Sequence, residues 1–230
     1  MRFLLIGLLW AVVSCASANV VINGTRVIYP LNSKEIVVQL INNGSDPALV
    51  QSWIDDGDMN STPETSRAPF LLSPPVVKVA GKGGQQLRIK KLPAKLPTDR
   101  ESVFYLNVLD VPPVPEEMQG MNTMQLAIKS RIKLFLRPEQ LHGGIDKAVE
   151  KVDVKAEGKG FRINNKSPFF ITVANVEGRN NKKMVAESLM LAPFSNAFTQ
   201  ATSLVKKGQP YSLIYVDDLG AYKKHDLVSQ

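Results

Sequence analysis

The chain has 230 residues, a formal net charge of +7 and a hydrophobic content of 44%. This length suffices for one large or two small β domains, and the hydrophobic content is ordinary for a protein with a packed core. A basic chain can bind nucleic acid, an anionic surface or acidic partners. Because no aromatic-rich basic stripe of the kind that stacks bases is visible, we expect no nucleic-acid binding, and solubility explains most of the lysines.

The first 18 residues have the pattern of a secretory signal peptide. Arg2 precedes the apolar stretch Phe3–Val13, which is too short to span a bilayer, and Ala16–Ala18 fits a small-residue cleavage site. We therefore expect residues 1–18 to be removed and the protein to be exported. Cleavage would also remove Cys15, the only cysteine, so packing rather than disulfides must stabilise the fold. Two alternatives stay open: a lipoprotein anchored through Cys15, and a buried N-terminal helix.

Short strand-like segments separated by turn signals follow. The expected strands are Val20–Ile28, Glu35–Asn42, Leu49–Ile54, Val76–Val79, Gln86–Lys90 and Ser102–Val108. Turns are expected at Asn43–Pro47 and at Gly81–Gly84. The second of these lacks the strand–loop–helix setting of a phosphate loop, so we interpret it as a hairpin turn. Prolines at Ser73–Pro75 and Val111–Pro113 interrupt the strands, and the sequence does not show whether Pro74 and Pro75 are cis or trans.

The run Thr123–Pro138 alternates more regularly than any other part of the chain. One side of an extended strand would carry the apolar residues Met124, Leu126, Ile128, Ile132, Leu134 and Leu136. The other side would carry Gln125, Lys129, Arg131, Lys133 and Arg137. Such a strand either buries its apolar face in the core or, at a sheet edge, offers a template for another chain to pair with.

A break after this strand separates two halves of the chain. Pro138 and the segment Leu141–Gly144 combine proline with paired glycines, which suits a domain linker. The second series of expected strands is Lys151–Ala156, Gly160–Asn164, Phe169–Val176, Met184–Leu191 and Ser212–Val216. Many short strands with turn signals, and no convincing amphipathic helix, predict two β-sandwiches. We expect an N-terminal domain at 19–138, a linker at 139–144 and a smaller C-terminal domain at 145–230.

The sequence lacks motifs for catalysis and for binding metals or cofactors. Its two histidines, His142 and His225, lie far apart, and no zinc cluster, nucleophile elbow, metalloprotease motif or nucleotide loop appears. The acidic run Asp55–Asp58 lacks the later glutamate of a calcium loop, so we interpret it as a solvated turn. We expect no catalytic residue, metal or cofactor, although a hydrolase built from distant carboxylates stays open.

Several segments together resemble the periplasmic chaperones of bacterial pilus assembly, typified by PapD. The matching segments, in the family's order, are Thr25–Pro30, Leu72–Pro75, Leu87–Ile89, Leu96–Asn107, Ile132–Pro138 and Ile163–Val173. Each motif is weak alone, but the ordered set covers nearly the whole chain after the signal peptide. The modest length of Leu109–Asn122 and the absence of cysteine after residue 18 resemble the short-loop class, whose members tend to serve rod-like pili.

The resemblance implies an all-β fold of two immunoglobulin-like β-sandwiches in an L or boomerang arrangement. It also implies a periplasmic chaperone that caps pilin subunits by donor-strand complementation and delivers them to an outer-membrane usher. In that role the chaperone lends the strand that the subunit lacks, with Met124, Leu126 and Ile128 as its apolar contacts. The resemblance implies no enzymatic activity, no small-molecule substrate and no nucleic acid.

Arg26 and Lys133 match the family's two cleft cations, which bind the C-terminal carboxylate of the subunit. A guanidinium can hold a carboxylate through two parallel hydrogen bonds, and an ammonium adds a point charge. Fixing the last residue of the subunit would set the register of the strand pairing. Lys133 has the opposite parity to the three apolar contacts, so the strand must bulge, bend or use both faces for all four to contact the subunit.

Glu101, Arg137 and Asp218 match residues that bridge the two domains in the family. As a charged network between rigid bodies, they would fix the angle of the cleft. Asp217 is adjacent to Asp218, so this match could be displaced by one residue.

A secreted β-sandwich adhesion protein or structural pilus component is the alternative function. Two complete strand series and the absence of cysteine after residue 18 argue against a pilin. A protein that polymerises in isolation would favour this alternative, and a stable monomer would count against it.

Overall fold

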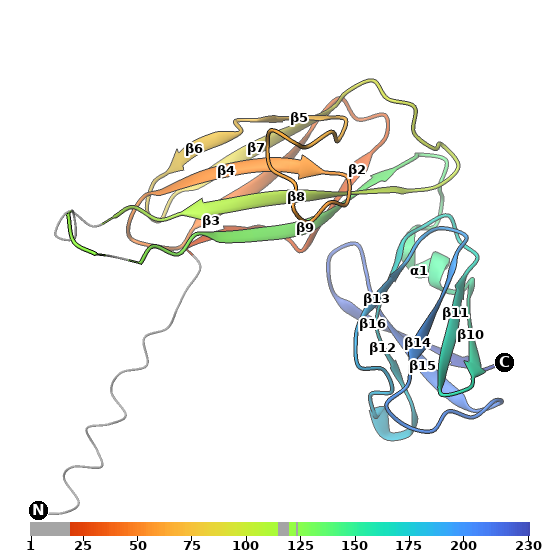
Figure 1. Cartoon of the computed structure of the whole chain (residues 1–230). Coiled ribbons are helices and arrows are strands. Elements are labelled where there is room, and N and C mark those ends of the chain that lie inside the picture. The colour runs from red at the N-terminus through yellow and green to blue at the C-terminus, as the bar shows by residue number, and fades with distance from the viewer. Residues whose placement is uncertain (1–18, 115–119, 123) are drawn as a thin grey trace, which may run out of the picture.

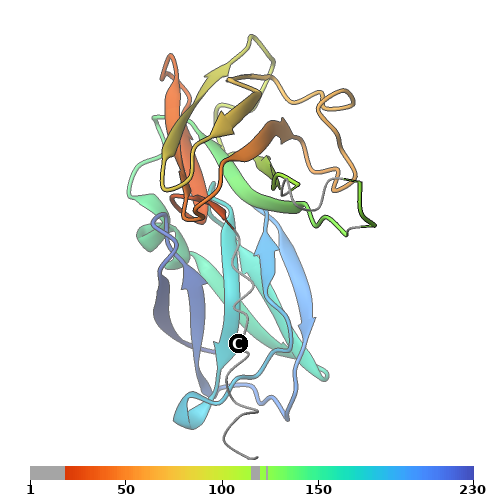
Figure 2. The same ribbon diagram turned by 90° about the vertical axis from the view of Figure 1, so that its left-hand side faces the viewer.

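The computed structural model describes residues 19–114, 120–122 and 124–230. The predicted signal peptide, residues 1–18 with Cys15, lies outside the described residues. The rest of the chain folds into two β-sandwich domains set at an angle to each other (Figures 1 and 2). The predicted all-β architecture of two sandwiches in an L arrangement is therefore confirmed. Within the described residues, no helix is both long enough and apolar enough to cross a bilayer.

The N-terminal domain consists of a four-stranded and a five-stranded sheet. Its strands are β1 (Val20–Ile22), β2 (Arg26–Pro30), β3 (Ile36–Asn42), β4 (Ala48–Asp55), β5 (Phe70–Ser73), β6 (Val76–Val79), β7 (Gly84–Lys91), β8 (Ser102–Val111) and β9 (Ile128–Arg137). The sheets have the orders β1-β3-β7-β5 and β2-β9-β8-β4-β6. All neighbouring strands are antiparallel except β2 and β9. The facing sides of the two sheets form one core, which includes Tyr29, Leu40, Leu87, Ile89, Leu106 and Leu134.

The predicted first strand, Val20–Ile28, is divided in the structure. β1 and β2 are separated at Gly24, whose φ of 124° is a backbone conformation that residues with a side chain rarely adopt. β1 pairs with β3 in one sheet, and β2 pairs with β9 in the other. The prediction of a single strand is therefore wrong. It failed because period-two alternation of side chains does not show where a chain passes from one sheet to the other. The division places Arg26, the first residue of β2, beside β9.

The glycine cluster Gly81–Gly84 forms a turn but not the predicted hairpin, because it joins β6 to β7 and these strands lie in different sheets. Glycine is required at position 81, since a Cβ atom there would lie 1.9 Å from the carbonyl oxygen of Ser45. The sequence pattern does not predict the short strand β5, which pairs with β7. The Ser73–Pro74 peptide bond, whose isomer the sequence leaves open, is cis.

The C-terminal domain consists of a three-stranded and a four-stranded sheet. It contains helix α1 (Gly144–Val149) and strands β10 (Val152–Glu157), β11 (Gly160–Asn165), β12 (Ile171–Glu177), β13 (Leu189–Leu191), β14 (Asn196–Gln200), β15 (Pro210–Val216) and β16 (Tyr222–Val228). The sheets have the orders β10-β11-β14 and β13-β12-β15-β16. The core between them includes Phe161, Ile163, Ile171, Leu213 and the apolar residues of α1.

The strand predictions are less complete in this second half. Of the predicted strand Met184–Leu191, only its last three residues form a strand, β13. The sequence pattern misses β14 and β16, because both lie at sheet edges and bury few side chains. The predicted linker, residues 139–144, follows β9 and includes the first residue of α1, and Leu141 within it packs against the C-terminal core.

Candidate functional site

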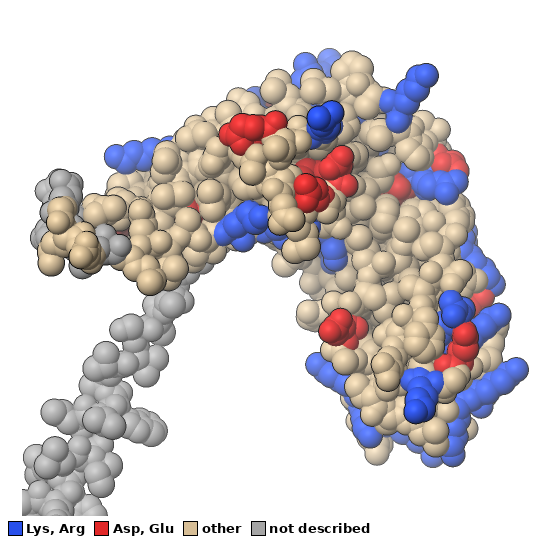
Figure 3. All heavy atoms as spheres, viewed as in Figure 1, with Lys and Arg blue, Asp and Glu red and all other residues tan. Residues whose placement is uncertain are grey.

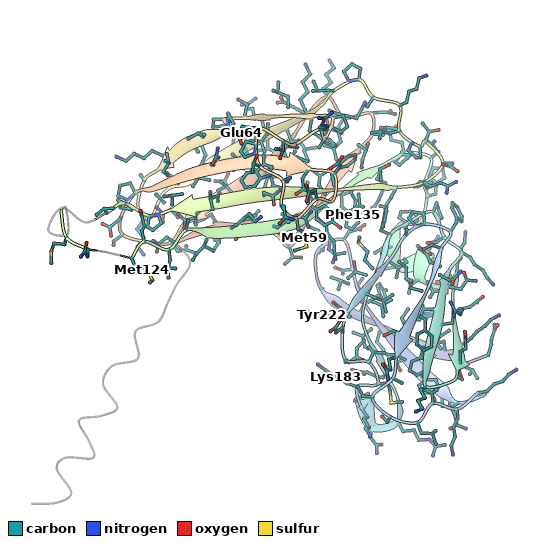
Figure 4. All side chains as sticks on the ribbon, in the orientation of Figure 1. Met59, Glu64, Met124, Phe135, Lys183 and Tyr222 are labelled. Atoms are coloured by element: carbon teal, nitrogen blue, oxygen red, sulfur yellow. The ribbon has the colours of Figure 1, made fainter. Side chains whose placement is uncertain are left out.

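The strand predicted for residues 123–138 is shorter in the structure. β9 begins at Ile128, where its pairing with β8 ends, and residues 124–127 pair with no described strand. The three predicted apolar contacts are exposed, by 89% for Met124, 71% for Leu126 and 44% for Ile128. The alternative of an apolar face buried in the core is therefore wrong for these three residues, but it is right for Leu134 and Leu136, which lie in the N-terminal core. In Figure 4 Met124 lies at the end of the N-terminal domain that is far from the C-terminal domain.

One edge of β9 is free over the first half of the strand. β8 pairs with β9 from Ile128 to Leu136, whereas β2 covers the opposite edge only from Lys133 to Arg137. Within the described part of the chain, nothing pairs with that opposite edge between Ile128 and Ile132. Such an edge presents unpaired backbone N–H and C=O groups that another strand can use.

Arg26 and Lys133 lie directly opposite each other where the free edge ends. The Arg26 guanidinium donates from Nη1 to the carbonyl oxygen of Val216 at 3.1 Å, and Lys133 Nζ donates to Thr172 Oγ1 at 3.4 Å. Val216 and Thr172 belong to the C-terminal domain, so both cations lie in the hollow between the domains, which we call the cleft. Neither cation forms an ion pair with a described residue, and Nε of Arg26 is buried without a hydrogen-bond partner.

The surroundings of Arg26 and Lys133 disfavour the charged forms of both side chains. Burial lowers the pKa of Lys133, and the positive charge of Arg26 lowers it further. Burial also lowers the pKa of Arg26, against the opposing effect of the more distant Asp218, Asp217 and Glu101. Like charges directly opposite each other on paired strands destabilise a sheet. A half-buried pair of cations that has no acidic partner in the described part of the chain is therefore suited to bind an anion such as a carboxylate.

Lys133 and Ile128, one of the three apolar contacts, lie on opposite faces of β9. The β8–β9 register continues without a shift from the Ser102–Leu136 pair to the Asp110–Ile128 pair, so β9 has no bulge there. Leu134 points into the N-terminal core. Lys133 and Phe135 point the other way, toward the C-terminal domain, where Lys133 contacts Thr172 and the ring of Phe135 lies 5.8 Å from that of Phe170. Figure 4 labels Phe135 on the side of the N-terminal domain that faces the C-terminal domain. The structure therefore excludes a bulge between Ile128 and Leu136, and contact of the subunit with both faces of the strand stays a prediction.

Arg137, at the end of β9, contacts acidic residues of both domains. Its Nε lies 2.6 Å from Oε1 of the buried Glu101, and its two terminal nitrogens each lie 2.7 Å from an oxygen of Asp218. Glu101 also accepts a hydrogen bond from the backbone N–H of Phe170 at 2.8 Å. Burial alone would lower the pKa of Arg137, but Asp218 and Glu101 raise it above its ordinary value. The contact is made by Asp218 and not by the adjacent Asp217.

The prediction of a solvated turn at Asp55–Asp58 is wrong for its first residue. Asp55 is fully buried and accepts hydrogen bonds from Arg131 of β9 at 2.6 and 3.0 Å and from Asn107 of β8 at 2.6 Å. The Arg131 guanidinium also lies over the ring of Tyr105, 3.6 Å from its centroid. The acidic run gives no hint of this burial, because its partners come from β8 and β9. No cluster of potential metal ligands occurs among the described residues.

Comparison with known proteins assigns the family. A model described as "Pili and flagellar-assembly chaperone, PapD N-terminal domain" matches residues 19–142. A second, described as "Pili assembly chaperone PapD, C-terminal domain", matches residues 147–227. The chain belongs to the PapD-like family of pilus assembly chaperones. The resemblance found in the sequence is therefore confirmed.

Individual relatives agree with this assignment over most of their length. Chaperone protein MrkB of Klebsiella pneumoniae is 41% identical over 206 residues, which cover 88% of this chain and 88% of MrkB. The CupB2 chaperone of Pseudomonas aeruginosa superposes with a TM-score of 0.79 at 34% identity, covering 91% of this chain and all of CupB2. Another similar structure is that of the Salmonella enterica SafA pilin in complex with the SafB chaperone. The matched chain superposes with a TM-score of 0.79 at 25% identity, covering 91% of this chain and 95% of the matched chain. These relatives do not favour the alternative of an adhesion protein or structural pilus component.

Proposed function

We propose that this chaperone captures pilin subunits in the periplasm on the free edge of β9 and delivers them to an outer-membrane usher. The observation that carries the proposal is an edge of β9 that pairs with no described strand and ends at two cations without an acidic partner among the described residues. The structural relative SafB is described in complex with a pilin, which supports a pilin as the client. Export of the chain rests on the predicted signal peptide at residues 1–18.

The geometry suits the end of a strand. Arg26 and Lys133 would bind the C-terminal carboxylate of the subunit, since together they supply a bidentate donor and a point charge. The residues before that carboxylate would then lie along the free edge from Ile132 back to Ile128. The subunit strand would therefore run parallel to β9, as β2 already does over the second half of the strand.

Apolar contacts would supply most of the binding energy. Met124, Leu126 and Ile128 share one parity and are exposed, so an incomplete subunit could bury all three in its groove. Burying each side chain would contribute about 1.5–3 kcal/mol. The backbone groups of the free edge would at the same time satisfy the unpaired groups of the subunit. Because the burial of apolar surface supplies the free energy of subunit binding, we propose no catalysis, cofactor or nucleotide for this chaperone.

Glu101, Arg137 and Asp218 would hold the two domains at the angle that keeps this site open. Arg26 and Lys133 both donate to residues of the C-terminal domain, so a change of domain angle would move the surroundings of the anchor. The Arg137 network lies at the same end of β9 and joins both domains through charge-assisted hydrogen bonds.

Co-purification from periplasm tests this function. The tagged chaperone and the variant Lys133→Ala are each expressed with a pilin subunit encoded beside the chaperone. We expect the subunit to co-purify with the unmodified protein and to be lost with the variant, since removing one partner of a buried charge contact costs about 2–5 kcal/mol of binding. Lys90→Ala serves as the matched control, because Lys90 is an exposed lysine on the other sheet of the same domain.

The two parts of the proposal fail differently in this experiment. Retention of the subunit by Lys133→Ala at the level of the control would overturn the anchoring role and leave the chaperone function intact. Absence of any subunit, although both proteins are present and folded, would overturn the proposed client.

A further inference from the structure

The end of the C-terminal domain that lies farthest from the N-terminal domain is strongly basic. Three segments meet there: residues 158–159 between β10 and β11, residues 178–188 after β12, and residues 201–209 before β15. They contain one acidic residue, Glu187, and six basic residues, namely Lys159, Arg179, Lys182, Lys183, Lys206 and Lys207. Glu157 and Glu177 end the adjoining strands at the same end of the domain, and the remainder of residues 145–230 contains seven basic and six acidic residues, so this end carries most of the positive charge of the domain. We call these six residues the basic end.

No acidic side chain among the described residues neutralises the basic end. All six side chains are exposed, and none forms an ion pair with a described residue. Elsewhere in the same domain Arg162, Lys166 and Lys223 each pair with an acidic residue. In Figure 3 Lys and Arg side chains gather at the lower end of the C-terminal domain, and Figure 4 places Lys183 on that part of the domain. The cluster is thus a surface of uncompensated charge, which attracts anions.

An exposed apolar side chain lies among these cations. A recess of about 280 Å³ is lined by Arg179, Lys182 and Lys206 together with Leu204 and Tyr211. Leu204 is 78% exposed, although leucine gains free energy from burial. Cations around an exposed leucine match the chemistry of a bilayer surface. Lipid phosphates would accept hydrogen bonds from the cations, and the apolar side chain would enter the boundary between the headgroups and the acyl chains.

We propose that the basic end docks on a bilayer that contains anionic phospholipids. An acidic polypeptide fits less well, because only Arg179, Lys182 and Lys206 line the recess, and the other three cations lie outside it at the tip of the domain. The contact is reversible, since it rests on charge and one apolar side chain. It is independent of subunit capture, because the free edge of β9 lies in the other domain.

Vesicle sedimentation tests the proposal with the chain from Asn19 onward. The vesicles consist of phosphatidylcholine alone or of phosphatidylcholine with phosphatidylglycerol. We expect binding only to the second kind, and binding that weakens as salt is added. The double variant Lys182→Glu, Lys206→Glu should bind at least about tenfold more weakly. The control double variant Lys34→Glu, Lys90→Glu changes the net charge equally on the N-terminal domain and should bind as the unmodified protein does.

A third variant separates a lipid from other anions. Leu204→Ser keeps the charge, so it should weaken binding to the anionic vesicles but leave binding to soluble polyglutamate unchanged. Equal loss in both double variants would show that net charge alone matters and would overturn the proposal. Binding to polyglutamate without binding to vesicles would also overturn it and would point to an acidic polypeptide. Circular dichroism of each variant confirms that the exposed substitutions leave the fold intact.

Discussion

Three basic residues on one face of β9, namely Arg131, Lys133 and Arg137, differ in their surroundings. Arg131 and Arg137 each contact a buried acidic residue, Asp55 in one case and Glu101 in the other. Lys133 lies between them on the same face, yet it has no acidic partner among the described residues and lies opposite Arg26 instead. The two arginines therefore join the strand and the domains through ion pairs, whereas the Arg26–Lys133 pair has no acidic partner among the described residues and is the anchor that we propose for an external anion. The three residues have the same position relative to the sheet, so only the residues that they contact distinguish a structural role from a proposed binding role.

The largest expected effect concerns the pair at the start of β9. Asp55→Ala would leave the Arg131 guanidinium partly buried without its acid, so we expect a loss of about 3–5 kcal/mol in the free energy of unfolding. Urea denaturation measures this loss. Asp56→Ala is the matched control, because Asp56 is exposed and should change stability by less than about 0.5 kcal/mol. Equal stability of both variants would contradict a structural role for Arg131.

A smaller effect is expected at the other end of the strand. Asp218→Ala removes one of two acids from Arg137 and leaves Glu101 in place, so we expect a cost of about 1.5–3 kcal/mol. Because Asp218 joins the domains, the domain angle should also become more variable, which small-angle X-ray scattering can detect. Asp226→Ala on β16 is the control, since Asp226 is exposed and remote from Arg137. An unchanged scattering profile for Asp218→Ala would show that other contacts hold the angle.

Low pH should remove the stabilisation that the Asp55–Arg131 ion pair contributes to the fold. Burial raises the pKa of Asp55, but hydrogen bonds from Arg131, Asn107 and Gly57 outweigh it and hold the pKa below the ordinary value. Asp55 therefore contributes stability at neutral pH and loses that contribution as the pH falls below about 4. We expect the stability difference between the unmodified protein and Asp55→Asn to shrink over this range. A difference that stays constant down to pH 2 would refute the ionised pair.

The smallest effect on folding is expected at the unpaired cations. Lys133→Met removes a like-charge contact with Arg26, so the free energy of unfolding should stay equal or rise by about 0.2–1 kcal/mol. The same variant should lose the pilin subunit, which would separate binding from stability at one residue. Arg131→Met provides the contrast, because it should lose stability by leaving Asp55 buried and unpaired. Destabilisation by Lys133→Met would mean that Lys133 stabilises the fold and is not reserved for a ligand.

Local patterns in the sequence were enough for much of the architecture. Alternation identified most central strands, since a strand with one face in a core repeats its buried side chains at every second residue. It failed for the edge strands β14 and β16, which bury few side chains, and for the change of sheet at Gly24. The order of short motifs identified the family, and this result also supplied the candidate residues Arg26 and Lys133.

The surroundings of those residues were decided by the tertiary structure alone. Arg26 contacts Val216, which lies 190 positions later in the chain, and no local pattern can show such a contact. The same holds for the burial of Asp55 under Arg131, which turned an apparently solvated turn into a structural ion pair. Sequence periodicity reports which side of a strand meets the core. Only the packing of separate strands and domains determines which cation finds an acid and which remains unpaired.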